Sequence, residues 1–299
     1  MLGFCISAPA GDAFAKILGD RLPLLELVVV RFAAQVILLL PLVMIRRLPW
    51  RSSGKTFWLI VARTVLHILG IGMMFSALRY LPLADAIAIA FVMPFIMLIL
   101  GRFVLNETVG HHRIIACAVG FVGTLLVVQP SFAAVGAPAF LPLGVAVDFA
   151  LFMLVTRQIA RKTDPVALQA VSGTIALIIL LPLVLLGAIA PPAGDFDAAI
   201  GFIMPENPGT WGYLFLIGTL GTLGHLLMTW SLRYAPSATL APMQYLEIPF
   251  ATLIGWLLFQ DLPNGLAALG IFITMAAGLY IIWREQASAR NLQATPAET

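Results

Sequence analysis

Long apolar stretches alternate with short polar breaks along the whole chain. A helix that crosses a membrane needs about 20 predominantly apolar residues, and by that rule the sequence predicts ten spans. The predicted spans are residues 2–19, 23–45, 56–78, 82–103, 112–130, 139–158, 165–189, 210–231, 236–258 and 264–283. The pattern therefore predicts an all-α membrane protein with ten transmembrane helices.

Composition supports a membrane environment. Of the 299 residues, 61% are apolar and 10% are charged, whereas soluble domains contain about 45–50% apolar and about 25% charged residues. The net charge is +3, but the basic residues fall in short loops between apolar segments. Because such loops lie beside lipid headgroups, the expected neighbour is an anionic bilayer surface and not a nucleic acid.

One segment occurs twice. Residues 77–82 (Ala-Leu-Arg-Tyr-Leu-Pro) recur 154 positions later at 231–236 (Ser-Leu-Arg-Tyr-Ala-Pro), and the acidic Glu107 recurs as Asp261 at the same spacing. Leu40–Leu42 also recur as Leu181–Leu183, at a spacing of 141, and the long 190–209 connection can hold the 13 extra residues. A repeat at half the chain length indicates two equivalent structural units.

Each unit holds five predicted spans, so the second unit must enter the membrane upside down relative to the first. The prediction is two inverted five-helix repeats, over residues 1–130 and 139–284, followed by a disordered cytoplasmic tail over 285–299. Inverted repeats of this kind recur in secondary transporters, where one half rocks against the other around a central site.

The basic residues predict the orientation. If the first span starts in the cytoplasm, twelve of the 17 Lys and Arg residues fall in cytoplasmic loops and the tail. Three fall outside and two lie within spans. Because basic loops stay in the cytoplasm, both termini are expected there, in the inner (plasma) membrane of a bacterium.

A short set of polar side chains falls inside the predicted spans. Ionisable groups there cost about 2.5–3.5 kcal/mol and usually face a protein interior or a water-filled cavity. The set is Asp12, Lys16, Arg31, Arg63, His67, Asp148, His225, Gln244, Tyr245 and Glu247. We interpret them as the lining of a substrate cavity, in which the cations hold a carboxylate and the acids hold an amine or a proton.

The alternative is that these groups form structural ion pairs. Asp12 and Lys16 are four residues apart and could pair along one helix, while Lys16 and Arg63 could extend to an interface. Asp148 and Glu247 are the stronger candidates for a cavity because neither has a cation at helical spacing.

Two prolines, Pro94 and Pro249, fall in the middle of predicted spans and are 155 positions apart. Proline removes a backbone hydrogen bond and bends a helix, so we interpret the pair as gating bends. The alternative is a static kink that improves packing.

No cofactor or catalytic chemistry is predicted. His111 and His112 are adjacent, so their side chains diverge on a helix, and no third ligand is spaced to complete a metal site. The sequence also lacks a Walker A loop, a dinucleotide fingerprint and the common hydrolase motifs, so an enzyme is not expected.

The sequence resembles the EamA domains of the drug/metabolite transporter superfamily. The resemblance rests on the two five-span halves, the repeated turn at 77–82 and 231–236, the mid-span prolines, the Glu107 and Asp261 ends, and Gly120–Gly123. It implies a ten-helix bundle with a central cavity and alternating access, moving amino acids or related metabolites, with exporters common in bacteria.

The resulting hypothesis is a secondary transporter of small polar metabolites, amino acids first, with protons as a coupling ion and a monomeric or homodimeric state. One alternative is an uptake carrier for riboflavin or S-adenosylmethionine, which related members handle. Another is a membrane receptor or assembly subunit that transports nothing, in which the polar groups would be paired and no cavity would exist.

Overall fold

The computed structural model describes residues 1–52, 54–104, 110–189, 203–235 and 240–294. Within these ranges all regular structure is helical and no strand occurs. The elements are α1 (Leu2–Gly19), α2 (Leu24–Ile45), α3 (Lys55–Leu78), α4 (Leu83–Ala90), α5 (Met93–Val104), α6 (His111–Val135), η1 (Ala137–Phe140), α7 (Leu141–Ala160), α8 (Pro165–Ile189), α9 (Pro208–Tyr234), η3 (Ala241–Leu246), α11 (Glu247–Phe259) and α12 (Gly265–Ala294). The all-α prediction is confirmed for the described chain.

Local sequence explains where several helices begin. The side chain of Asp164 accepts hydrogen bonds from the backbone of Val166 and Ala167 at the start of α8. Asn207 and Asn264 cap α9 and α12 in the same way. Such side chains satisfy backbone N–H groups that have no partner within the helix.

Seven helical segments in the described chain are long and apolar enough to cross a membrane, and Met243–Phe259 and Gly265–Tyr280 are shorter apolar helices. The polar Asp12 and Lys16 lower the hydropathy of α1, which is not among the seven. A multi-pass membrane protein follows from these helices.

The two segments that carry mid-span prolines are interrupted helices. α4 ends at Ala90 and α5 begins at Met93, so Pro94 lies in the first turn of a new helix. Likewise η3, a 3₁₀ segment, precedes α11, and Pro249 is the third residue of α11. Proline is tolerated in a first turn, where its missing N–H has no helical partner anyway. The predicted bends inside continuous helices are therefore replaced by breaks upstream of each proline.

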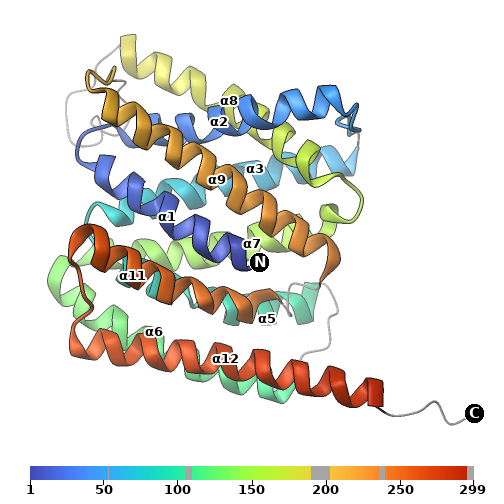
Figure 1. Cartoon of the computed structure of the whole chain (residues 1–299), viewed down its shortest axis with the longest axis vertical. Coiled ribbons are helices and arrows are strands. Elements are labelled where there is room, and N and C mark those ends of the chain that lie inside the picture. Colours follow the sequence, from blue (N-terminus) through green and yellow to red (C-terminus); the bar gives the residue numbers. More distant parts are fainter. Residues whose placement is uncertain (53, 105–109, 190–202, 236–239, 295–299) are drawn as a thin grey trace, which may run out of the picture.

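The helices form one bundle with a pair of helices at each end. In Figure 1, α2 and α8 lie side by side at the top and α6 and α12 at the bottom, with α1, α3, α7 and α9 between them. α6 and α12 approach closely at two glycines: a β-carbon at Gly123 would lie 2.7 Å from the carbonyl oxygen of Gly270. Small residues allow such contact in lipid.

The C-terminal segment differs from the prediction. α12 continues to Ala294, so residues 285–294 are helical where a disordered tail was predicted. The segment contains three alanines and two glutamines with one Glu, one Arg and one Leu, all of which favour helix. Residues 295–299, Glu107, Pro236 and residues 190–202 of the long connection lie outside the described residues.

Candidate functional site

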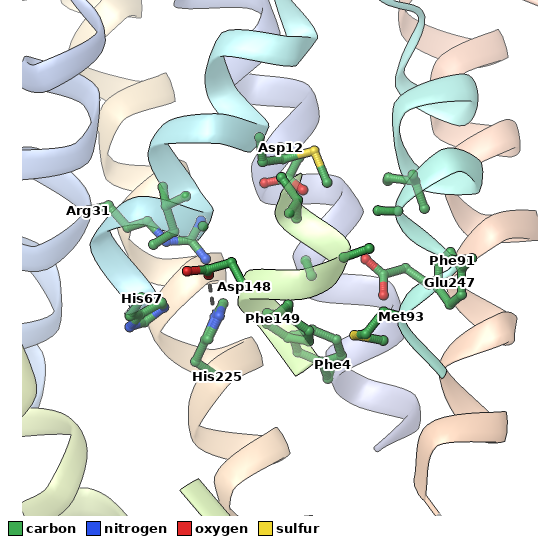
Figure 2. Close-up of a pocket in the computed structure, with 18 residues that line it drawn as sticks. Phe4, Asp12, Arg31, His67, Phe91, Met93, Asp148, Phe149, His225 and Glu247 are labelled. Carbon is green, nitrogen blue, oxygen red and sulfur yellow. Dashed lines mark hydrogen bonds between the residues drawn. The ribbon is translucent and has the colours of Figure 1, made fainter. Parts of the chain in front are cut away.

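A cavity lies in the centre of the bundle. α1, α2, α3, α4, α5, α7, α9 and α11 contribute side chains to it, and its volume is about 90 Å³. Six of the ten predicted polar residues line it: Asp12, Arg31, His67, Asp148, His225 and Glu247. Figure 2 shows these side chains converging from different helices. The two helix breaks also meet here, because Ala90, Phe91 and Met93 lie on one and Glu247 on the other.

Arg31 and two histidines form a basic wall. Nη2 of Arg31 lies 3.1 Å from Nδ1 of His225, drawn as a dashed line in Figure 2. Nδ1 of His225 lies equally close, 3.1 Å, to the carbonyl oxygen of Gly221. Arginine can only donate and a carbonyl can only accept, so the two contacts of this nitrogen call for opposite tautomers of the ring. The ring of His67 lies 4.3 Å from that of His225, centroid to centroid. Nη1 of Arg31 and both ring nitrogens of His67 are buried without a hydrogen-bond partner among the described residues.

Two glycines make room for the charged groups. A β-carbon at Gly221 would lie 2.7 Å from Cζ of Arg31, so the guanidinium rests directly on the backbone of α9. A β-carbon at Gly70 would touch Oδ2 of Asp148 and lie 3.4 Å from its Cγ. The positions of Arg31 and Asp148 therefore depend on the absence of a side chain on the facing helix.

The acidic side chains of the cavity carry no ion pair. No Lys, Arg or His nitrogen lies within 4.0 Å of the carboxylates of Asp12, Asp148 or Glu247 in the described chain. Oδ2 of Asp148 is buried with no hydrogen-bond partner there. Glu247 is the first residue of α11, where the helix dipole favours a negative charge. A buried charge without a partner destabilises a protein, so the presence of such groups indicates a functional site.

Three aromatic rings complete the lining, and sequence reasoning did not single them out. Phe4 stacks on Phe149 with ring centroids 6.0 Å apart and meets His225 edge-on at 5.6 Å. Phe91 lines the opposite side, beside Glu247 in Figure 2. Helical spacing would have found Phe4, because Phe4, Ala8 and Asp12 share one face of α1.

Four predicted residues do not line the cavity. Arg63 is fully buried behind it, donating to the hydroxyls of Thr156 at 2.9 Å and Ser172 at 2.8 Å. It therefore does not extend to an interface. Nε2 of Gln244 donates to the sulfur of Met153 at 3.5 Å. The remaining two, Tyr245 and Lys16, make contacts between helices.

Lys16 pairs with a residue far away in the chain. Its Nζ donates to the carbonyl oxygen of Leu81 at 2.8 Å and lies 3.4 Å from Oδ2 of Asp261. This is the one ion pair among the described side chains. The alternative in which Lys16 pairs with Asp12 along α1 is therefore not what forms, because the lysine bonds the carbonyl of Leu81 and the carboxylate of Asp261 instead.

The structure also shows what surrounds the histidine pair, His111 and His112, at the start of α6. Within the described residues, no group of three His, Cys, Asp or Glu side chains could hold a metal ion. His112 instead contacts Tyr280 and Arg284 of α12.

The membrane-length helices, and a central cavity in which six polar side chains lie among apolar ones, are typical of a multi-pass membrane protein of the transporter class. The sequence model of the EamA-like transporter family matches residues 1–129 and 137–284, and the chain belongs to this family. The two matched ranges correspond closely to the predicted repeats, 1–130 and 139–284.

Curated relatives are named transporters of three different compounds. A riboflavin transporter of Rhizobium johnstonii is 29% identical over 243 residues, covering 81% of this chain and 73% of the relative. An S-adenosylmethionine uptake transporter of Rickettsia bellii is 25% identical and covers 94% and 91%. A pseudopaline exporter of Pseudomonas aeruginosa is 24% identical and covers 91% and 88%.

A solved crystal structure shares the fold. It matches with a TM-score of 0.66 and 16% identity, over 98% of this chain and 97% of its own. The likeness at this identity supports the arrangement of helices alone.

Proposed function

We propose that the protein is a secondary transporter of zwitterionic, amino-acid-like metabolites that works by alternating access. The observation that carries the proposal is the mixed charge of the central cavity: Arg31 on one wall, with Asp148 and Glu247 unpaired in the same space. A carboxylate on the solute would bind Arg31, and an amine or other cation would bind Glu247. A neutral solute would leave these charges desolvated and unpaired.

S-adenosylmethionine matches the charges of the cavity better than riboflavin does. S-adenosylmethionine carries an amino-acid group and an additional positive charge, which matches a cavity with one cation and several acids. Riboflavin is uncharged but flat, and the rings of Phe4, Phe91 and Phe149 could stack on it. Riboflavin-type uptake is therefore the second candidate. Because both uptake and export occur among the relatives, amino-acid export stays a prediction.

The cavity must widen to hold such a solute. Its volume of about 90 Å³ is room for about three water molecules, whereas pockets for metabolites measure about 300–1,000 Å³. A central cavity between two halves that move apart is what alternating access requires.

Contacts between repeat-equivalent residues support an inverted arrangement of the halves. The ring of Phe91 lies 5.3 Å from that of Tyr245, 154 positions later. The hydroxyl of Thr274 donates to the carbonyl of Gly120, 154 positions earlier, at 3.3 Å. Equivalent residues touch each other where a two-fold axis passes between two units.

Reciprocal contacts give the same indication. Gly70 of α3 faces Asp148 of α7, and Gly224 of α9 faces Ser7 of α1. The glycines are 154 positions apart and their partners 141, which are the two spacings of the sequence repeat. Furthermore, α1 begins and α12 ends toward the same side of the bundle in Figure 1. This agrees with ten spans and with both termini in the cytoplasm.

The first prediction tests the substrate class. In proteoliposomes, wild-type protein should exchange radiolabelled S-adenosylmethionine or α-amino acids, and Arg31→Gln should raise KM by about 10- to 100-fold, the value of a charge-assisted hydrogen bond. Arg46→Gln, an exposed arginine at the end of α2, is the control and should behave as wild type. The proposal fails if amidated or decarboxylated analogues are handled as well as the parent compounds.

A second prediction concerns proton coupling at Glu247. Glu247→Gln keeps the size of the side chain but cannot bind and release a proton, so accumulation driven by a pH gradient should be lost. Counterflow exchange should continue at saturating solute, with a raised KM because the amine loses its charged partner. Uptake against a gradient is compared with exchange at equal pH. If wild-type transport is indifferent to the pH gradient, protons are not the coupling ion.

A third prediction concerns closure at Lys16. The Lys16–Asp261 pair joins α1 to the link between α11 and α12. Lys16 also donates to a carbonyl of the first copy of the repeated turn, that of Leu81. Arg157, 141 positions after Lys16, donates to a carbonyl of the second copy, that of Leu232. The ion pair joins the tip of a long lysine to a carboxylate, so two cysteines at these positions need a bridge longer than a disulfide. We expect Lys16→Cys with Asp261→Cys, cross-linked by a bifunctional methanethiosulfonate reagent, to stop transport, and reduction of the bridge to restore it. Transport that continues at full rate in the cross-linked protein would show that this end of the bundle does not open.

The rival reading, a receptor or assembly subunit that transports nothing, has a separate test. In the single variants Asp148→Cys, His225→Cys and Glu247→Cys, the introduced thiol should react with a water-soluble thiol reagent if the cavity opens to water. Complete protection of all three, with the folded protein intact, would favour the rival.

A further inference from the structure

A polar cluster joins the ends of α6 and α12, away from the central cavity. Oη of Tyr280 lies 3.2 Å from Nδ1 of His112, and Nη2 of Arg284 lies 3.2 Å from Nε2 of the same ring. Since arginine can only donate, Nε2 accepts and Nδ1 carries the proton that bonds Tyr280. The contact with His112 is the one hydrogen bond of the Arg284 side chain to a described side chain, and no described carboxylate lies within ion-pair distance.

An apolar groove begins at this cluster. It runs between α6 and α12, has a volume of about 320 Å³, and includes Ile115, Val119, Phe272, Ala276 and Tyr280. Tyr280 therefore belongs to both the groove and the cluster. The pair α6–α12 forms the bottom edge of the bundle in Figure 1, so the groove faces the surroundings of the protein.

The cluster occurs at one end of the helix pair only. The positions 154 residues away from His112 and Tyr280 are Leu266 and Leu126, and the counterpart of Arg284 is Pro130. The helix pair is held in its middle by the contact of Gly123 with Gly270. The packing of α6 against α12 therefore does not in general require a polar cluster. Because the cluster occurs at one end of this helix pair, it suggests a ligand that is present on one side of the membrane.

We propose that the groove and the cluster bind one anionic phospholipid of the cytoplasmic leaflet. An acyl chain lies in the groove between Val119 and Phe272, and the phosphate accepts hydrogen bonds from Arg284. The charges are complementary, and basic pockets between helices on the cytoplasmic side suit such headgroups. The ring of Trp283 lies 6.3 Å from that of Tyr280, and such aromatic residues favour the membrane interface. The orientation expected from the basic residues puts this end in the cytoplasm.

Phosphatidylglycerol and phosphatidylcholine, added to purified full-length protein in detergent, test the proposal. Retention of each lipid is measured by native mass spectrometry, and the apparent Tm is measured alongside. We expect phosphatidylglycerol to be retained and to raise Tm, and the double variant His112→Gln/Arg284→Gln to weaken its retention by about tenfold. Both replaced side chains are exposed, so the fold should persist. Arg46→Gln, another exposed arginine on the predicted cytoplasmic side, should retain the lipid fully.

A second variant tests the groove itself. Ala276→Phe should fill the groove and weaken phosphatidylglycerol retention with the basic cluster unchanged. Inorganic phosphate alone should not raise Tm, because it lacks the acyl chain. Equal retention of both lipids, retention unchanged in the double variant, equal stabilisation by inorganic phosphate, or a protein dimer that covers the groove without lipid would each overturn the proposal. None of these results depends on the transported solute, so they leave the proposed function to its own tests.

Discussion

Replacing Gly221 by alanine is expected to weaken binding of a carboxylate-bearing solute by about 10²-fold, the cost of misplacing a binding group by about 1 Å. The β-carbon would lie 2.7 Å from Cζ and 2.9 Å from Nε of Arg31. The guanidinium must therefore move away from α9, and its hydrogen bond to His225 is lost with it. Concentration dependence of transport separates a raised KM from a lowered maximal rate, and the main change should be in KM.

A matched control lies on the same helix. Gly212 of α9 has no other atom within 4 Å of an added β-carbon, so Gly212→Ala should transport as wild type. Combining Gly221→Ala with Arg31→Lys should recover part of the affinity, since a lysine head is narrower than a guanidinium. A Gly221→Ala protein with unchanged KM would show that the position of Arg31 does not set solute affinity.

Helix positions could be predicted well because apolar length and capping residues are local properties of the chain. The span expected at 23–45 is α2, Leu24–Ile45, and that expected at 56–78 is α3, Lys55–Leu78. The composition of the cavity was also partly predictable. A charged side chain in a membrane-spanning helix usually faces the protein interior or a water-filled cavity. The charged residues Asp12, Arg31, Asp148 and Glu247 all line the cavity.

Contacts between helices could not be predicted in the same way. Helical spacing offered Asp12 as a partner for Lys16 within α1, but Lys16 bonds Asp261, which is distant in sequence. Arg63, like Arg31, is an arginine inside an apolar helix, yet it donates to hydroxyl groups of α7 and α8 and lies behind the cavity. The roles of Gly70 and Gly221 depend on which side chain faces them across the interface, and helical periodicity does not contain that information.

The largest effect on stability is expected from Gly123→Val. A β-carbon at Gly123 would lie 2.7 Å from the carbonyl oxygen of Gly270 and 3.0 Å from the backbone nitrogen of Thr274. Both are backbone atoms, so no side chain can rotate away and α6 and α12 must separate. Overpacking typically costs about 1–3 kcal/mol, and for a chain of 299 residues an apparent Tm lower by about 2–5 °C should result.

Gly265→Val is the control for this substitution. It places the same side chain at the start of α12, where nothing lies within 4 Å of an added β-carbon. Its Tm should stay close to that of wild type. Adding Thr274→Ala to Gly123→Val should restore little stability, because the carbonyl of Gly270 remains in the way. Equal Tm values for Gly123→Val and Gly265→Val would mean that the close glycine contact does not hold α6 against α12.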